Sequence, residues 1–304
     1  MDIIESIFFI LQDGLELGLI WSIMALGIFI SYRALETADL TAEGAVTLGS
    51  SITLSLILKG MSAPLALLIA LLGGFIAGAI TGILHTKLKI PAILSGIITM
   101  TGLYSINLRV MGKASLYLGD EITVYSYLRE IINSSAASKI MTTLLVVVII
   151  FFILYWFFGT EIGMSLRATG MNQKMARAQG INTHFMIILG LAISNALIAL
   201  SGALSAQSNR TANMDIGKGT IVIGLASIII GEVIFGKKSF KNWLIAVILG
   251  SIVFQIIVGI AIALGLNPND LKLVQAILIA FILALPVIKK TKAKYKKPEV
   301  KLNA

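Results

Sequence analysis

The sequence predicts an all-α fold, a polytopic bundle of transmembrane helices, from its composition and from its long apolar runs. Of the 304 residues, 57% are hydrophobic and only 13% are charged, whereas a soluble domain typically has about 25% charged residues. The longest polar interval, 112–138, is too short to bury a core of its own. We therefore expect a single transmembrane domain over residues 1–288 and a basic tail at 289–304.

Nine apolar runs predict about nine spans, because a helix that rises 1.5 Å per residue needs roughly 20 apolar residues to cross a bilayer. In chain order the runs are 14–30, 40–58, 63–84, 91–107, 141–158, 185–204, 220–235, 243–264 and 271–288. The short polar intervals between them connect neighbouring spans.

Three of these runs begin irregularly. Pro91 stands in the first turn of one run, where its missing N–H costs nothing, and segment 39–44 places acidic residues at the start of another. The run 220–235 is the shortest, so we expect it to cross the membrane only in part. Such broken half-helices line a cavity or a route through the membrane. The plainer interpretation, in which Asp39 and Pro91 are ordinary helix starts, stays open.

Segments 39–49 and 215–224 resemble each other, because each leads from an aspartate through glycine and threonine into an apolar run. With the orientation given below, the two segments start on opposite sides of the membrane. This pattern is typical of an inverted repeat, in which two halves pack around a central pathway.

The formal charge of +9 is explained by topology. If the C-terminus is inside, about two thirds of the Lys and Arg residues lie on the cytoplasmic side, which is the usual bias of membrane proteins. The N-terminus is then outside. The tail 289–304 is cytoplasmic and contacts anionic lipid. It lacks the aromatic residues that a nucleic-acid site would need, so no nucleic-acid partner is expected.

A polar, basic island at about 159–184 separates two long apolar runs. Basic residues alternate in it with small ones, which predicts a short helix with a flat face and a basic rim, suited to docking on a soluble partner. The residues that carry this prediction are Gly163, Arg167, Ala168, Gly170, Lys174, Ala176, Arg177 and Gly180.

Small residues recur every four positions in the run 63–84. Such a stripe lets a neighbouring helix approach closely, either within the chain or at a subunit interface. The stripe consists of Ala70, Gly74, Gly78 and Gly82.

Polar residues within the apolar runs are the candidates for a translocation path. They are Thr41, Thr99, Thr101, Asn107, Ser194, Asn195, Gln255 and Gln275. None is charged, which argues against a proton relay or a sodium-coupled mechanism. Glu232 stands near the end of its run, and we expect it to pair with Lys237 or Lys238.

No motif for catalysis, metal binding or nucleotide binding is present. The chain has no cysteine and its two histidines, His85 and His184, stand alone at the ends of runs. An intramembrane serine protease is not expected either, because it would need a serine and a histidine at matching depth, and both histidines stand at the ends of runs. A phosphate-binding loop of the form Gly-x-x-x-x-Gly-Lys-Ser/Thr is absent, so we expect no bound cofactor and no enzymatic activity in this chain.

The island and segment 39–49 together resemble the permease subunits of bacterial ABC importers, of the branched-chain amino acid and ribose type. The resemblance spans nearly the whole chain, and the island is similar to the cytoplasmic coupling loop of that family. Within the family the chain is similar to permeases for which amino acid substrates, including aromatic ones, are suspected.

This resemblance implies a permease in the bacterial cell membrane that works as a homodimer or pseudo-dimer around one pathway. Two cytoplasmic ATPase subunits would bind ATP and Mg²⁺, and an extracytoplasmic binding protein would deliver a small solute, with interval 112–138 as its docking site. Arg167 and Arg177 would make charge contacts with the ATPase, while the small residues would permit close approach.

Two alternatives remain. An ion-coupled secondary transporter would also have broken helices and an inverted repeat, and an ABC permease could carry sugars or nucleosides. The apolar runs contain no charge that could hold the carboxylate or ammonium group of a substrate, so we expect the binding protein to provide most of the selectivity.

Overall fold

The computed structural model describes residues 3–132, 134–264, 273, 276–277 and 280. Within these residues the chain is mostly helical. The predicted all-α class and the polytopic arrangement are confirmed. The predicted span 271–288 and the tail 289–304 fall largely or wholly outside the described residues.

Seven described helices are long and apolar enough to cross a membrane, and the described residues do not confirm a count of nine. The seven are α1 (Ile3–Phe29), α2 (Thr41–Leu58), α3 (Ala63–Thr86), α4 (Ala92–Met111), α6 (Ser135–Gly159), α9 (Thr183–Asn209) and α11 (Phe240–Ala263). The predicted short run forms the shorter apolar helix α10 (Thr220–Phe235), as the sequence indicated.

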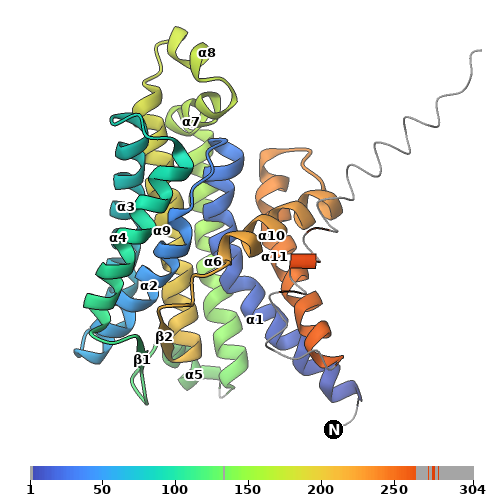
Figure 1. The fold of residues 1–304 in the computed structure, drawn as a ribbon. Helices are drawn as coiled ribbons and strands as arrows, with labels where there is room; N and C mark the ends of the chain where they lie inside the picture. Colours follow the sequence, from blue (N-terminus) through green and yellow to red (C-terminus); the bar gives the residue numbers. More distant parts are fainter. Residues whose placement is uncertain (1–2, 133, 265–272, 274–275, 278–279, 281–304) are drawn as a thin grey trace, which may run out of the picture.

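The remaining elements lie at the two ends of the bundle (Figure 1). At one end are α7 (Glu161–Met171) and α8 (Gln173–Ala178), which form the basic island. At the opposite end, called the strand end below, are α5 (Val124–Ile132) and a two-stranded antiparallel sheet of β1 (Ser115–Tyr117) and β2 (Thr211–Asn213). Helix α1 also begins at the strand end (Figure 1).

Helix α9 is the centre of the bundle. It packs against α1, α2 and α3, and most of its residues are buried inside the protein. Helices α3, α4 and α6 instead carry large apolar side chains on their outer faces, for example Leu68, Tyr104 and Phe152. An apolar outer surface of this kind is suited to contact with lipid.

The small-residue stripe of α3 lies against α9. A Cβ atom added at Gly82 would lie 2.7 Å from Cα of Ile188, and one added at Gly74 or Gly78 would overlap the α9 backbone. Ala70, the fourth residue of the stripe, is fully buried. The stripe therefore brings two helices of the same chain into backbone contact.

The connection between α1 and α2 is irregular. Helix α1 continues past the predicted end of its run as a π-helical segment, Ile30–Ala34, a geometry that is rare and common at functional sites. The chain then turns, with a positive φ of 51° at Glu36, and reaches Asp39. The Asp39 carboxylate accepts a hydrogen bond from the N–H of Thr41, the first residue of α2, at 2.9 Å and so satisfies one of the N–H groups that the helix itself leaves without a partner.

Candidate functional site

A cluster of polar side chains lies among α2, α3, α4 and α9. The Asp39 carboxylate accepts a hydrogen bond from the side-chain amide of Asn195 at 2.6 Å. The hydroxyl groups of Thr41 and Thr81 are 2.8 Å apart, and Thr81 donates to Thr99 at 2.9 Å. Three residues predicted for the pathway, Thr41, Thr99 and Asn195, therefore meet in one cluster through Asp39 and Thr81.

This cluster lies deep in the bundle. Asn195 comes twelve residues after the start of α9 at Thr183, which corresponds to about 18 Å along the helix. Asp39 contacts Asn195 there and is buried. The expectation that no carboxylate lies among the spans is therefore wrong. Hydropathy showed where the polar connection lies in the sequence, but not that it folds back between the helices.

A second group of polar residues lines a cavity of about 310 Å³ between α2, α4 and the segment that precedes α10. Asn107 donates from its side-chain amide to the Gly44 carbonyl at 3.3 Å. Its oxygen Oδ1 is buried and has no hydrogen-bond partner among the described residues. The full lining consists of Glu43, Gly44, Thr47, Met100, Thr101, Tyr104, Asn107, Met214, Gly217 and Lys218.

The first turns of α2 and α10 meet at this cavity. The Glu43 carboxylate, in the first turn of α2, accepts a hydrogen bond from the N–H of Gly219, the N-cap of α10, at 2.9 Å. Gly217 lies against the Glu43 backbone so closely that a Cβ atom would overlap it. The N-terminal end of a helix attracts negative charge, so the Glu43 carboxylate interacts favourably with the N-terminal ends of both α2 and α10.

A positively charged side chain, that of Lys218, also lines the cavity. Lys218 forms an ion pair with Asp215 at 2.5 Å, and its side chain is exposed. The hydrogen bond with Asp215 raises the pKa of Lys218, so Lys218 is a cation at neutral pH. Sequence reasoning missed both Glu43 and Lys218 as cavity residues, because 176 positions separate Glu43 from its partner Gly219.

The other predicted pathway residues are not in the Asp39 cluster. Thr101 and Asn107 line the cavity, and Ser194 donates its hydroxyl to the Gly27 carbonyl of α1 at 2.7 Å. Gln255 is buried on α11, a helix that packs mainly against α1 and α10, and Gln275 lies outside the described residues. The predicted path residues that the structure describes therefore divide among four places in the bundle.

The basic island folds as the helices α7 and α8. Arg167 is exposed on α7, with its guanidinium carbon 4.7 Å from the centre of the Phe240 ring, a distance typical of a cation–π contact. On α8, Lys174 is exposed, and Arg177 donates from Nε to the hydroxyl of Thr183 at 2.7 Å. The three cations thus surround a small helical projection.

Small residues attach this projection to the bundle. Gly163 and Ala176 are buried, and Ala168 is half-buried. Gly170 lies so close to the Ala34 carbonyl, at the end of the π-helical segment, that a Cβ atom would overlap it. Gly180 has a φ of 81°, a conformation that suits glycine in the turn after α8.

Three methionines on the projection point into solvent. Met171 is 81% exposed, and Met175 and Met164 are also largely exposed. Flexible, polarisable side chains of this kind are common on protein-binding surfaces. Sequence reasoning named the basic and small residues and missed these methionines, although their positions in a short polar helix were the available signal.

An ion pair joins α10 to the π-helical segment near the same end. Arg33 lies 2.7 Å from Glu232, and the indole N–H of Trp243 donates to the same carboxylate at 2.9 Å. The expected partners of Glu232, Lys237 and Lys238, were therefore wrong. The actual partner is distant in the sequence and comes close only in the folded chain.

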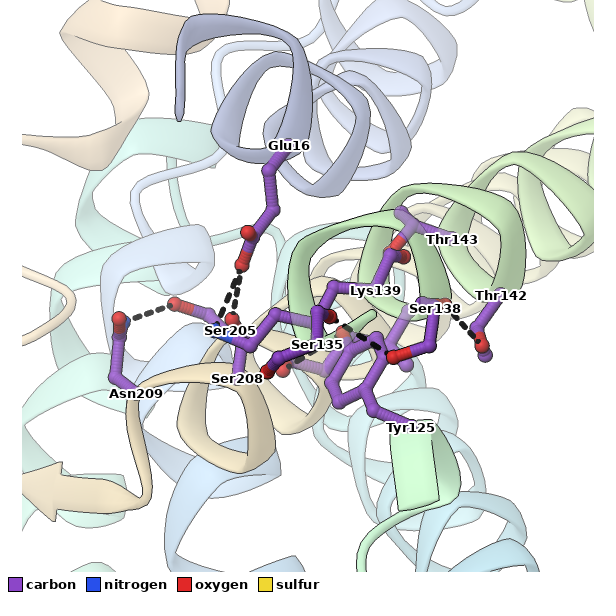
Figure 2. A network of polar contacts seen from close by, with 11 residues as sticks. Glu16, Tyr125, Ser135, Ser138, Lys139, Thr142, Thr143, Ser205, Ser208 and Asn209 are labelled. Atoms are coloured by element: carbon purple, nitrogen blue, oxygen red, sulfur yellow. Dashed lines mark hydrogen bonds and ion pairs between the residues drawn. The ribbon is translucent and has the colours of Figure 1, made fainter. Parts of the chain in front are cut away.

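The strand end has its own polar network. Figure 2 shows Glu16 of α1, Lys139 of α6 and Ser208 of α9 converging there. Lys139 lies 3.2 Å from Glu16, and Ser208 donates to the same carboxylate. Tyr125 of α5 donates to the Leu204 carbonyl at 3.1 Å. These contacts fix α5 and α6 to the central helix.

No three His, Cys, Asp or Glu side chains lie together as a possible metal site in the part of the chain that the structure describes. His85 instead lies with its Nδ1 atom 2.8 Å from the Ile90 carbonyl. This contact holds the turn between α3 and α4.

Comparison with known proteins gives a consistent result. A sequence model of the family described as branched-chain amino acid transport system permease component matches residues 10–285. The tyrosine transport system permease protein of Clostridioides difficile (strain R20291) is 43% identical over 281 residues, 91% of this chain and 92% of that protein. The galactofuranose transporter permease protein of Escherichia coli (strain K12) is 25% identical over 251 residues, 81% of this chain and 70% of that protein. No solved structure gives a significant match.

The family match includes all seven long apolar helices and the basic island. The predicted resemblance to importer permeases is confirmed. So is the predicted location, a multi-pass protein of the cell membrane, and the relatives are transport subunits rather than enzymes. This chain belongs to the family of permease components of branched-chain amino acid transport systems.

Proposed function

We propose that this permease component is the membrane subunit of an ABC importer for an amino acid. The relative that is 43% identical over most of both chains is a tyrosine transport system permease protein, which favours an amino acid over a sugar. In this proposal ATP and Mg²⁺ bind to separate ATPase subunits, and the chain moves its solute by alternating access.

The observation that carries the proposal is the α7–α8 projection. It combines exposed cations with exposed methionines, among them Arg167, Lys174 and Met171. Cations give electrostatic attraction to a partner, and methionines give adaptable apolar contact. A cytoplasmic ATPase with a groove for this projection would bind it through both kinds of contact.

The attachment of the projection supports a route for the motion. Gly170 rests on Ala34, and Leu35 fills the space beside Gly190 of α9. These residues lead directly to Asp39 and the start of α2. A displacement of α7 by the ATPase would therefore move the chain that holds the Asp39 cluster, and Arg33 would carry the movement to α10 through Glu232.

This function assigns the two ends of the bundle to the two sides of the membrane. The α7–α8 end is cytoplasmic, in keeping with the bias of Lys and Arg toward that side. The N-terminus and the strand end are then extracytoplasmic, and α5 with its neighbouring loops would receive the binding protein. The tail 289–304 would lie at the cytoplasmic surface against anionic lipid.

A second copy of the chain completes the transporter in this proposal. Tyr104 of α4 lines the cavity, and its side chain is largely exposed. Two copies that meet across this face of α4 would enclose one pathway. Helices α2 and α10, which start side by side at the cavity, would be the matching half-helices of an inverted repeat.

Affinity purification of the tagged chain from its native membrane in mild detergent, followed by mass spectrometry, tests this function. We expect an ATPase with a phosphate-binding loop and a second permease copy in the purified complex. Purification of the permease alone, under conditions that keep other importers intact, would contradict the proposal.

A further inference from the structure

The cavity between α2, α4 and the segment before α10 contains both signs of charge. Glu43 supplies a carboxylate and Lys218 an ammonium group. Gly219, the residue after Lys218, donates its N–H to Glu43 at 2.9 Å. The Cα atom of Lys218 therefore lies within about 6 Å of that carboxylate, by covalent geometry.

Each charged group has capacity for a ligand. Oε1 of Glu43 binds Gly219, whereas Oε2 receives no hydrogen bond from the described residues. Lys218 has three N–H donors and pairs with one carboxylate, that of Asp215. The cavity can thus accept a hydrogen bond from a cation and donate one to an anion.

A third group points to a ligand independently of these charges. Oδ1 of Asn107 is buried, lines the cavity and has no hydrogen-bond partner among the described residues. A buried acceptor without a partner is unfavourable, and a bound donor removes that cost. A substrate ammonium group can satisfy both Asn107 and Glu43.

The remaining walls are apolar and large. Met100, Tyr104 and Met214 line the cavity, and such side chains favour an aromatic or a large aliphatic group. The volume of about 310 Å³ is at the lower end of the range of about 300–1,000 Å³ for small-molecule sites. One amino acid with a large side chain fits this volume.

We propose that this cavity binds the zwitterionic head of an amino acid, with the ammonium group on Glu43 and Asn107 and the carboxylate on Lys218. The side chain of the substrate then lies against Met100 and Tyr104. This proposal rests on the proposed amino acid importer and adds a selective site in the permease itself. It differs from the expectation that the binding protein provides most of the selectivity.

A neutral sugar fits this site less well. It offers no cation to the Glu43 carboxylate and no anion to Lys218, which then keeps its exposed ion pair with Asp215. An amine or an acid alone would neutralise one of the two groups. Only a zwitterion satisfies both, so the site should discriminate against analogues that lack either charge.

The test uses the permease–ATPase complex without the binding protein, so that the selectivity measured is that of the permease. The probes are L-tyrosine, tyramine, which lacks the carboxylate, and 3-(4-hydroxyphenyl)propionate, which lacks the amine. Dissociation constants come from titrated shifts of the thermal unfolding midpoint. We expect the unaltered complex to bind L-tyrosine at least tenfold more tightly than either analogue.

Two variants then separate the two charges. Lys218→Met should remove the preference for L-tyrosine over tyramine, and Glu43→Gln should remove the preference over the propionate. Both variants should fold. In Glu43→Gln the glutamine oxygen can still accept from the N–H of Gly219, and in Lys218→Met the substituted side chain is exposed. Lys59→Met and Glu121→Gln, on exposed residues outside the cavity, are the matched controls and should keep both preferences.

ATP-driven uptake of L-tyrosine by the complete system is measured in parallel. Two results, each together with uptake, would refute the binding site but not the importer function. One is equal or absent binding of the three probes, and the other is an unchanged preference in both variants. Absence of amino acid uptake by an assembled complex overturns the proposed function itself.

Discussion

The Asp39 carboxylate and the Asn195 side-chain amide are joined by a 2.6 Å hydrogen bond that connects the start of α2 to the middle of α9. The same carboxylate accepts a hydrogen bond from the N–H of Thr41 at 2.9 Å. A polar connection is thus held inside the bundle, between two helices that also contact the α7–α8 projection or line the cavity.

Replacing Asp39 tests this connection. Asp39→Ala removes the acceptor of the Thr41 N–H and leaves the Asn195 amide with one partner fewer, so we expect a loss of about 2 kcal/mol or more in the free energy of unfolding. Asp39→Asn keeps an acceptor oxygen and should cost less. Thermal unfolding of the purified protein measures both, with Asp120→Ala, at an exposed aspartate, as the control. Equal stability of Asp39→Ala and the control would show that the bond contributes nothing.

Contact between α3 and α9 depends on Gly78. Leucine at this position would overlap the Leu191 carbonyl and force the helices apart, at a cost of about 1–3 kcal/mol or more. We expect Gly78→Leu to reduce the yield of monodisperse protein in size-exclusion chromatography. Gly102→Leu is the matched control, because Gly102 has open space around it in the chain. Equal yields of the two variants would mean that the stripe does not hold α3 against α9.

Charge on the α7–α8 projection should hold the ATPase. Arg167→Glu combined with Arg177→Glu is expected to leave the permease in the membrane, to lower recovery of the ATPase at least tenfold and to abolish uptake. Lys59→Glu combined with Lys113→Glu makes the same change of charge near the strand end and should retain the ATPase. Co-purification measures both, and a stable ATPase complex in the first variant would refute the docking role.

The ion pair between Arg33 and Glu232 should couple the π-helical segment to α10. A double-mutant cycle with Arg33→Leu and Glu232→Gln is expected to give a coupling energy of about 0.5–3 kcal/mol in thermal unfolding. A second cycle combines Glu232→Gln with Lys238→Met, because Lys238 is the partner of Glu232 that proximity in the sequence suggested. This cycle should give no coupling energy. Additive effects in the first cycle would show that the pair is not a stabilising contact.

The long helices were predictable from sequence because lipid imposes a simple rule of length and apolarity. The starts of α2, α3 and α10 at Thr41, Ala63 and Thr220 agree with the predicted runs within one residue. The close contact at Gly78 also has a direct sequence signal, since small residues every four positions form one helix face.

The irregular parts were not predictable in the same way. The π-helical segment Ile30–Ala34 and the depth of Asp39 depend on how α1, α2 and α9 pack. Likewise, the cavity places Glu43 beside Lys218, residues of different halves of the chain. Hydropathy reports the composition of a segment, whereas these features arise from tertiary contacts between distant segments.

The central claim is that this permease imports an amino acid by using an ATPase. The most direct measurement is uptake of radiolabelled L-tyrosine into proteoliposomes that contain the permease and its co-purified ATPase, with the binding protein outside. We predict saturable accumulation that requires ATP within the vesicles and is lost in the Arg167→Glu, Arg177→Glu variant. Accumulation by the permease alone, driven by a sodium or proton gradient without ATP, would contradict the account.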